Sequence, residues 1–269
     1  MKQDDGYTFK TSYHYFAKGT ISGNRHNDKD EKVGRTRVNR QGFQMTIVEY
    51  NSTTDCVIEF NDKYKTRIRI GYLYFKKGTA RNPNYRWLAE KVLIDKNDIE
   101  KNPTAFEKYR AMIDRCYGKQ KYNNVVYKGC KICEEWFDFE NFVKWFNTNY
   151  YTIENESMEL DKDLFGNGKL YSPETCIFVS HKLNSWFAMF KDYRDRKTNL
   201  PMGVSLYDNG YGKKRYRVVS LEKGQLFDDL EEASKAYKEN VKRKFKEYAE
   251  IHKNEIPNKL YDKLINYEI

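Results

Sequence analysis

One segment of the chain, residues 158–190, restricts the fold more than any other. Two short runs of strand-forming residues, MELDKDLF and CIFV, are separated by the turn-rich GNGKLYSPET and followed at once by the helical pattern SHKLNSWFAMF. Strands this close in the chain pair as a hairpin, and the helix should pack back over that hairpin to bury its apolar side. The segment therefore predicts a β-β-α unit.

The residues before this unit predict two amphipathic helices. The first begins at Pro103 and ends at Gly118, and the second covers FDFENFVKWFNTNYY. VVYKGCKICEEW, between them, is expected to be a short extended stretch. The residues expected to face inward are Phe106, Tyr109, Met112, Ile113 and Cys116 in the first helix, and Phe139, Phe142, Val143 and Phe146 in the second.

The amino-terminal region contains an internal repeat. The pattern Tyr-x-Tyr-Phe-x-Lys-Gly-Thr occurs in residues 13–20 and again in residues 72–79. The second copy follows the strand-like runs FQMTIVEY and CVIEF and lies in part within a third, KTRIRIGYLYF. We expect a three-stranded antiparallel unit with Arg67 and Arg69 on one face and the intervening isoleucines on the other. Arg67 and Arg69 are therefore candidate DNA-binding residues, and Cys56 is assigned to packing.

The segment between the two copies, SGNRHNDKDEKVGRTRVNRQG, is polar and punctuated by glycine, which predicts a linker or arm. It is either a basic arm that follows a DNA groove or a mobile solvated loop. The basic residues concerned are Arg25, Lys32, Arg35, Arg37 and Arg40.

The carboxyl-terminal region predicts three short strands and a helix. GVSLY, KRYRVVSL and QLF are separated by the turn signals DNGYG and EKG, and Asp228 or Asp229 can cap the helix that follows. Alternation in the middle strand places Arg215 and Arg217 on one face and Tyr216 on the other. The arginine face is the expected DNA-facing surface.

The charge distribution favours a polyanionic partner. Lys and Arg number 49 against 39 Asp and Glu, a formal net charge of +10. Residues 1–100 hold 19 basic and 13 acidic side chains, residues 101–187 hold 12 of each, and the remainder hold 18 and 14. Basic flanks around a neutral centre suit a protein that holds a phosphate backbone with its arms and concentrates carboxylates for metal chemistry between them. Three ordinary solvated surfaces are the alternative.

Composition also bears on location. With 33% charged residues and no apolar run of about 18 residues, the sequence predicts no membrane span. The first residues, MKQDDGYTFK, lack the apolar stretch of a signal peptide, and five cysteines are an odd number for a disulfide framework. We therefore expect a cytoplasmic protein with reduced thiols.

Candidate metal ligands lie in the β-β-α unit. Asp161 and Asp163 are two residues apart on the expected strand, so both carboxylates should emerge on one face, about 6 to 7 Å apart. Asn184, on the expected helix, can add an oxygen ligand, and His181 lies one turn before it. Oxygen ligands of this kind suit Mg²⁺. The alternative is an exposed strand face beside an exposed helix amide.

Three stretches together resemble the HNH-type proteins common in bacteriophages and prophages. They are YRAMIDRCYG, GCKICEEWFDFENFVKWF and LDKDLFGNGKLYSPETCIFVSHKLN, and the resemblance covers about residues 105–187. It implies a ββα-metal site that cleaves DNA, with Asp161 and Asn184 binding Mg²⁺ or Mn²⁺. Asp161, Asp163 and His181 are the candidate catalytic residues.

The sequence departs from the HNH pattern at two positions. Lys162 stands where the catalytic histidine would be, and Thr175 where the central asparagine would fall. Lysine, with an ordinary pKa of about 10.4, is a poor general base at neutral pH. Either His181, Tyr171 or a metal-bound water replaces the base, or the fold keeps its DNA surface without cleavage.

Four cysteines lie in this region, and some HNH folds are braced by a four-cysteine zinc. Cys130 and Cys133 have the CxxC spacing of a zinc knuckle, but a second CxxC is missing. We expect buried, reduced thiols, and a structural Zn²⁺ site is the alternative. That site would use Cys116, Cys130, Cys133 and Cys176.

The carboxyl-terminal segment, from about residue 202 to 249, resembles a divergent APETALA2-type DNA-binding domain, in which a three-stranded sheet enters the major groove and a helix supports it. A Gly-Val opening, a basic middle strand, a Phe before the helix and the start Glu-Glu-Ala-x-x-Ala-Tyr carry the resemblance. It implies DNA contacts by Lys213, Lys214, Arg215, Tyr216 and Arg217.

The sequence thus predicts an α+β protein in three parts: an amino-terminal module of repeated small antiparallel β units (1–100), a central HNH-like ββα-metal domain (101–190) and a carboxyl-terminal three-stranded sheet with helices (198–269). The expected function is a metal-dependent endonuclease or nickase of phage HNH or homing type that acts on double-stranded DNA in a bacterial cytoplasm. The alternatives are a non-catalytic DNA-binding phage protein on a degenerate HNH scaffold, and a factor whose basic arms bind an acidic host protein.

Overall fold

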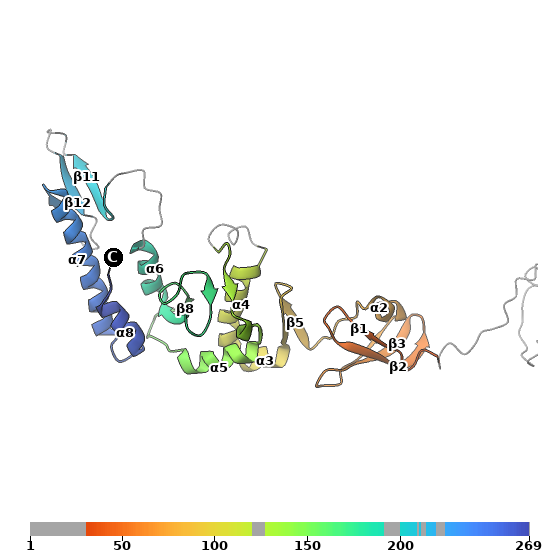
Figure 1. Ribbon diagram of the computed structural model, residues 1–269. Helices are drawn as coiled ribbons and strands as arrows, with labels where there is room; N and C mark the ends of the chain where they lie inside the picture. Colours follow the sequence, from red (N-terminus) through yellow and green to blue (C-terminus); the bar gives the residue numbers. More distant parts are fainter. Residues whose placement is uncertain are drawn as a thin grey trace, which may run out of the picture. The chain divides into compact units, whose positions relative to one another are not determined.

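The computed structural model describes residues 31–119, 127–190, 200–208, 210, 214–218 and 224–268. The chain divides into two compact units, which are described separately (Figure 1). Unit 1 comprises residues up to 87 together with 93–97, and unit 2 comprises 88–92 and the residues from 98 onward. Both contain helices and small sheets, most of them antiparallel, so the α+β prediction is confirmed.

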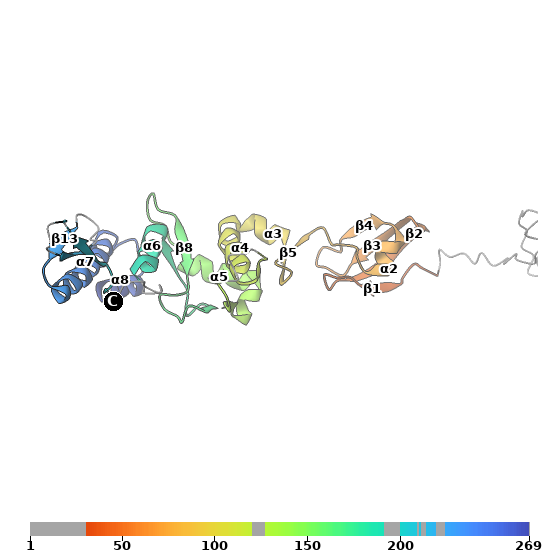
Figure 2. The ribbon, with the colours of Figure 1, turned by 90° about the horizontal axis from the view of Figure 1, so that it is seen from above.

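Unit 1 is built on a four-stranded antiparallel sheet with a short helix and a β-hairpin (Figure 2). The strands pair in the order β1-β2-β3-β4. Its elements are β1 (Thr36–Val38), β2 (Gln44–Ser52), β3 (Asp55–Phe60), β4 (Arg67–Ile70) and α2 (Tyr72–Lys77), together with most of the hairpin strands β5 (Tyr85–Leu88) and β6 (Val92–Asp95), whose connecting residues 88–92 are counted in unit 2.

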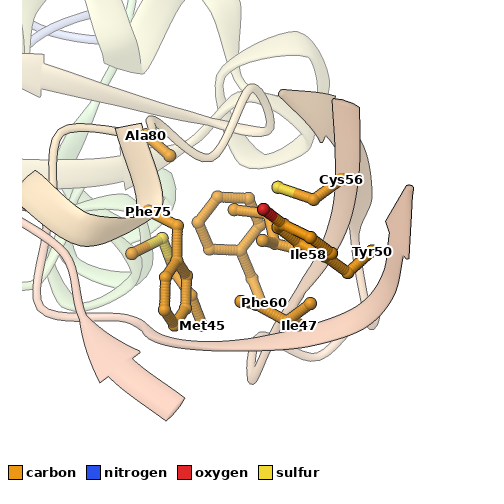
Figure 3. Packing of buried hydrophobic residues seen from close by; sticks show 8 residues of the cluster. All are labelled: Met45, Ile47, Tyr50, Cys56, Ile58, Phe60, Phe75 and Ala80. Atoms are coloured by element: carbon orange, nitrogen blue, oxygen red, sulfur yellow. The ribbon is translucent and has the colours of Figure 1, made fainter. Parts of the chain in front are cut away.

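The core of unit 1 lies between one face of the sheet and α2. Alternate residues of β2 and β3 point inward, and Phe75 of α2 closes the cluster (Figure 3). Cys56 is fully buried in this cluster, as its assignment to packing predicts. The predicted three-stranded unit is therefore present, with Ile68 and Ile70 packed on the core and Arg67 exposed on the other face.

Two predictions about unit 1 are wrong in detail. The strand KTRIRIGYLYF ends at Ile70, because Gly71 begins α2 and Gly78, at φ 64°, ends it. Part of the predicted linker is also structured, since β1 pairs with β2. The first copy of the repeat and Arg25 lie outside the described residues.

Unit 2 joins the central helices and hairpin to the carboxyl-terminal sheet. Its sheets are the pairs β8–β10 and β7–β9 and the antiparallel sheet β11-β12-β13. Its elements, with α3 at the boundary of the two units, are α3 (Lys96–Lys101), α4 (Pro103–Tyr117), β7 (Lys131–Ile132), the 3₁₀ helix η2 (Glu134–Phe137), α5 (Phe139–Asn149), β8 (Met158–Asp161), β9 (Leu170–Tyr171), β10 (Ile177–Ser180), α6 (His181–Phe190), β11 (Val204–Asp208), β12 (Lys214–Val218), β13 (Gln225–Phe227), α7 (Leu230–Ile251) and α8 (Asn258–Ile265).

An aromatic core holds the central part of unit 2 together. Trp136 of η2 contacts Phe142 of α5 at 5.1 Å between ring centroids, and Phe146 of α5 contacts Phe178 of β10 at 5.5 Å. Tyr109 of α4 donates a hydrogen bond to the Trp136 carbonyl at 2.7 Å. The two predicted helices are present, and their predicted inward residues are buried except Val143 and Cys116, which are half-buried.

The carboxyl-terminal helix packs on the β-β-α unit as well as on its own sheet. Phe187 of α6 stacks on Phe245 of α7 at 5.2 Å, and the hydroxyls of Ser180 and Tyr248 lie 2.8 Å apart. Asp229 caps α7 by accepting from the Glu232 N–H, which settles the choice between the two predicted capping residues. The division of the chain into three domains stays a prediction. The predicted central and carboxyl-terminal domains both lie in unit 2, where α6 and α7 share one core.

Among the helices that the structure describes, none is long and apolar enough to span a bilayer.

The close approach of Gly203 to α7 gives a test of the packing between sheet and helix. A Cβ atom at Gly203, whose φ is 71°, would lie 2.0 Å from a ring carbon of Tyr237. We expect Gly203→Ala to lower the free energy of unfolding by about 1 to 3 kcal/mol more than Gly210→Ala, because overpacking adds to backbone strain. Gly210 also has a positive φ, but nothing lies within 4 Å of its added Cβ. Gly210→Ala therefore measures the cost of backbone strain without overpacking. Urea denaturation of both variants measures the difference, and equal losses would contradict the packing.

Candidate functional site

The β-β-α unit predicted from the sequence is present. β8 and β10 are antiparallel, with Asp161 opposite Ile177 and Met158 opposite Ser180, and α6 begins at the next residue. The helix packs against both strands. This arrangement brings Asp161 and Asn184, the two predicted metal ligands, to the lining of one pocket of about 690 Å³.

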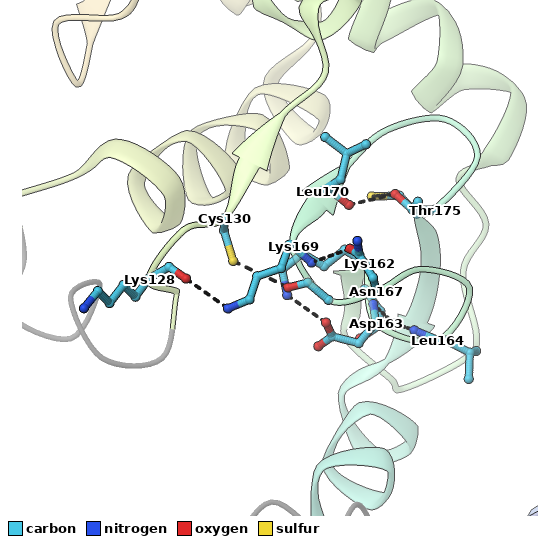
Figure 4. Close-up of polar contacts among 12 residues, drawn as sticks. Lys128, Cys130, Lys162, Asp163, Leu164, Asn167, Lys169, Leu170 and Thr175 are labelled. Atoms are coloured by element: carbon cyan, nitrogen blue, oxygen red, sulfur yellow. Dashed lines mark hydrogen bonds and ion pairs between the residues drawn. The ribbon is translucent and has the colours of Figure 1, made fainter.

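The pocket carries both acidic and basic groups. Asp161 and Asp163 face it together with Arg115, Lys162 and Lys169, so its formal charge is positive. Figure 4 shows Lys162, Asp163 and Lys169 close to one another, and Lys169 donates a hydrogen bond from Nζ to the Lys128 carbonyl at 2.9 Å. A positively charged pocket that also offers carboxylates can take a phosphate group, alone or with a divalent cation.

Asp161 and Asp163 do not share a strand face, contrary to the prediction. β8 ends at Asp161, whose Oδ1 accepts hydrogen bonds from the N–H groups of Asp163 (2.9 Å) and Leu164 (2.8 Å). A carboxylate that bonds backbone two and three residues ahead starts a turn instead of continuing a strand. Asp161 therefore holds the loop after β8 as well as facing the pocket.

Lys162 is buried and forms an ion pair with its neighbour. Its side chain is 8% exposed, and Nζ lies 2.8 Å from Asp163 Oδ1. Nζ also lies 5.4 Å from the centre of the Tyr171 ring. Burial acts to lower the pKa of Lys162, but the hydrogen bond and charge of Asp163 outweigh it and raise the pKa. Lys162 is therefore an ammonium at neutral pH and cannot serve as a base there.

Glu159 is the functional candidate that our sequence analysis missed. It accepts a hydrogen bond from Asn184 Nδ2, and its Oε1 lies 2.7 Å from His181 Nδ1. Burial acts to raise the pKa of Glu159, but His181 and Asn184 together lower it. The alternation in MELD contained the signal, because Met158 and Leu160 are buried and Glu159 shares the other face with Asp161.

Neither His181 nor Tyr171, the side chains considered as substitutes for the missing histidine, is placed to act as a general base in the pocket. His181 pairs with Glu159 and is absent from the described residues that line the pocket. Tyr171 lines it, but burial raises its pKa well above the usual range and outweighs the charge of Arg115, which acts to lower it. Thr175, at the position of the missing asparagine, bonds the Leu170 carbonyl at 2.8 Å.

The oxygen set fits a magnesium ion in ligand type. Asp161 and Asn184 supply a carboxylate and an amide at one pocket, which is as many protein ligands as Mg²⁺ often takes. Among the described residues, no three His, Cys, Asp or Glu side chains come together to hold a metal. Asp161 and Asn184 would hold Mg²⁺ or Mn²⁺ at this pocket, with water or phosphate completing its shell.

The four cysteines of the central region are free thiols. Cys130 and Cys176 are buried, and Cys116 and Cys133 are half-buried. Burial raises the pKa of Cys116 and of Cys176 to about 12, so both are protonated thiols at neutral pH. Cys130 donates to the Gly168 carbonyl at 3.6 Å. A zinc site made of these four residues stays a prediction.

In the carboxyl-terminal sheet the arginines of β12 lie on the face opposite to its buried valine, as the alternation predicts. Val204 and Val218 pair and are buried on the side that α7 covers, and Tyr216 shares that side. Arg215 and Arg217 lie on the opposite face. Of the other predicted DNA contacts, Lys214 is exposed at the start of β12, and Lys213 lies outside the described residues.

The arginine face of this sheet is partly organised by local contacts. Arg217 lies over the ring of Tyr207, with 4.3 Å from its guanidinium carbon to the ring centroid. Arg215 bonds Asp228 Oδ1 at 2.8 Å and the Leu226 carbonyl at 3.2 Å. Both side chains are thereby held on one side of a sheet that has a helix behind it.

In unit 1, acidic residues surround the predicted arginine face. Arg67 bonds Glu59 at 2.8 Å, and Arg69 bonds Asp55 at 2.6 Å and Glu49 at 3.4 Å. Three carboxylates beside two guanidinium groups leave this face without surplus positive charge.

Comparison with protein-family models, curated proteins and solved structures found no match to this chain.

The low pKa of Glu159 predicts a pH-dependent contribution to stability. A carboxyl whose pKa is lower in the folded than in the unfolded state stabilises the fold above its unfolded pKa, here about 4.5, and loses that contribution as pH falls through the folded value. We expect Glu159→Gln to be less stable than the parent at neutral pH and the gap to close in acid. Urea titrations at both pH values measure this, with the exposed Glu154→Gln as control, and a gap independent of pH would contradict it.

Proposed function

We propose that this protein binds duplex DNA through the outer face of the β11-β12-β13 sheet. The observation that carries the proposal is the placement of Arg215 and Arg217 together on the face away from α7. Arginine on a short, supported sheet can bond phosphates and the edges of bases in the major groove. The resemblance to APETALA2-type domains supports the same surface.

The pocket of the β-β-α unit supports a phosphate contact at a second place. Arg115, Lys162 and Lys169 line it and can bond a phosphate. The net charge of +10 agrees with a polyanionic partner. The HNH resemblance also supports a phage or prophage origin and action in the cytoplasm of a bacterial host.

Two candidates remain for what happens after binding. Metal-dependent cleavage or nicking is favoured by Asp161 and Asn184, which line the same pocket and would hold Mg²⁺ or Mn²⁺ there. Such an ion would polarise the scissile phosphate and stabilise the leaving oxygen. Binding without efficient cleavage is favoured by Lys162, a buried ammonium at the position of the histidine base.

The DNA-binding proposal predicts that Arg215→Ala combined with Arg217→Ala weakens duplex binding more than tenfold at moderate salt. The change removes two guanidinium groups from the arginine face, Arg217 and the Arg215 that Asp228 orients. Fluorescence anisotropy with a labelled duplex measures it, after thermal melting has checked the fold. Lys235→Ala with Lys238→Ala, on the exposed side of α7, is a control of equal charge change. An equal effect of both pairs would mean that only overall charge matters, and no effect of the arginine pair would exclude this face.

The two candidates for chemistry are separated by restoring the base. If only the base is missing, Lys162→His should raise Mg²⁺-dependent nicking of a bound duplex by about 10² to 10⁴, the usual contribution of a general base. Asp161→Asn in the same background should remove the gain, because the amide keeps an oxygen for the turn but lacks the charge that holds the metal. Lys162→Ala is the matched control.

Three results of that nicking assay would be informative. An unmodified chain that already cleaves as fast as Lys162→His would show that the base lies elsewhere. A gain by Lys162→Ala equal to that of Lys162→His would show that loss of the lysine matters and the imidazole does not. No cleavage by any variant with Mg²⁺ or Mn²⁺ would leave DNA binding without catalysis.

A further inference from the structure

The internal repeat retains two residues that the core of unit 1 does not explain. Four of the six shared positions have structural roles in the second copy. Tyr72 packs edge-on against Tyr50, Phe75 is buried, Gly78 ends α2 with a positive φ, and Thr79 is half-buried directly after it. The other two shared positions, Tyr74 and Lys77, are exposed.

The two copies of the repeat differ at exposed positions, so exposure does not explain why Tyr74 and Lys77 are shared. The two positions of the motif that differ between the copies are Leu73 and Lys76, which correspond to His14 and Ala17. Both are exposed in the second copy, as Tyr74 is at 58%. Since neighbouring exposed positions have changed, the retention of Tyr74 and Lys77 points to contact with something outside the core.

Two more cations lie beside the end of α2. The Arg40 N–H donates to the Gly78 carbonyl at 2.9 Å, and Arg37 Nε lies 3.4 Å from the place where a Cβ of Gly78 would stand. Arg37, Arg40 and Lys77 are exposed. Among the described residues no carboxylate pairs with these cations, in contrast to Arg67 and Arg69 on the sheet face.

Arg37, Arg40, Tyr74 and Lys77 together define the β1–α2 surface. Tyr74 and Lys77 are three residues apart on α2 and lie on one side of the helix. The arginines come from β1 and the turn that follows it, which the Gly78 contacts hold against the end of α2. Three cations and a phenolic hydroxyl are the donor types that proteins use on DNA phosphates.

We propose that the β1–α2 surface binds the phosphate backbone of duplex DNA, an inference that rests on the proposed DNA-binding function of unit 2. Arg37, Arg40 and Lys77 neutralise phosphates, and the Tyr74 hydroxyl donates a hydrogen bond to a phosphate oxygen. Unit 1 then contributes affinity without reading sequence, because phosphate contacts carry no base information.

A protein partner is the competing occupant, and the repeat argues against it. Leu73, at 55% exposed, is the apolar side chain on α2 best placed to anchor such a partner, yet the first copy has His14 at that position. At the two positions that are exposed in the second copy and shared by both, the residues are a lysine and a tyrosine, whose ammonium and hydroxyl groups suit phosphate.

The test compares two pairs of substitutions in the full chain. Arg37→Ala with Lys77→Ala removes two cations from the β1–α2 surface, and Arg67→Ala with Arg69→Ala removes two from the sheet face, where carboxylates already compensate them. Duplex affinity is measured by anisotropy across a series of salt concentrations. We expect the first pair to weaken binding by roughly tenfold and to reduce the slope of log affinity against log salt by about 1.8, and the second pair to change neither by a comparable amount. Tyr74→Phe, which keeps the ring, should weaken binding by about threefold through loss of one hydrogen bond.

The possible outcomes separate this inference from the function on which it rests. If Arg215→Ala with Arg217→Ala weakens binding but the β1–α2 pair changes neither affinity nor slope, the DNA-binding function stands and the β1–α2 surface is excluded. Equal effects of the β1–α2 pair and the Arg67 and Arg69 pair would also overturn the inference, because they would reflect overall charge. If the unmodified chain does not bind duplex with a steep salt dependence, the DNA-binding function fails first. An unchanged affinity of Tyr74→Phe would remove Tyr74 from the surface.

Discussion

The packing of α6 against α7 is the interaction on which the arrangement of unit 2 depends. α6 completes the β-β-α unit and supplies Asn184, while α7 supports the carboxyl-terminal sheet. Stacking of Phe187 on Phe245, and the hydroxyl contact between Ser180 and Tyr248, bring the two helices into one core. Because buried aromatic pairs resist rearrangement, this core holds the β-β-α unit and the carboxyl-terminal sheet together.

The chemistry of the pocket is set by how its charges are paired. Glu159 is shared between His181 and Asn184, and Asp163 is paired with Lys162. These pairs fix the rotamers of the groups around the pocket, since a buried or half-buried charge is stable only with a partner. With Lys162 and Asp163 paired, Arg115 and Lys169 outnumber Asp161, so the pocket carries a net positive charge. The fold is thus compatible with phosphate whether or not a metal joins it.

The sequence was most informative where one periodicity continued without interruption. The helices that begin at Pro103 and Phe139 and the hairpin of β8 and β10 followed from their patterns, because their buried faces repeat at 3.6 or 2 residues. It was misleading where a turn interrupted an alternating run. YLYF continues the alternation of RIRI, but Gly71 and Gly78 confine it to a helix.

The same cause explains the errors at the candidate site. Asp163 continued the spacing of Asp161, yet Asp161 bonds the backbone ahead of it and ends the strand. Glu159 was overlooked because its role arises from α6 packing over β8, a contact between residues 25 positions apart in the chain. The pairing of Arg67 with Glu59 was hidden for a similar reason, since it depends on the register of two strands. Partners set by tertiary contact are not encoded in local spacing.

The shared core of α6 and α7 also has a consequence for how such a protein can be rebuilt by recombination. A sheet and helix that docked only on DNA could be exchanged between proteins as a cassette. Here a junction between residues 190 and 200 would separate Trp186 and Phe187 from the helix that covers them, and would leave Phe245 without its stacking partner. The carboxyl-terminal sheet and α7 therefore depend on the aromatic side of α6, and an exchange of one would have to include the other.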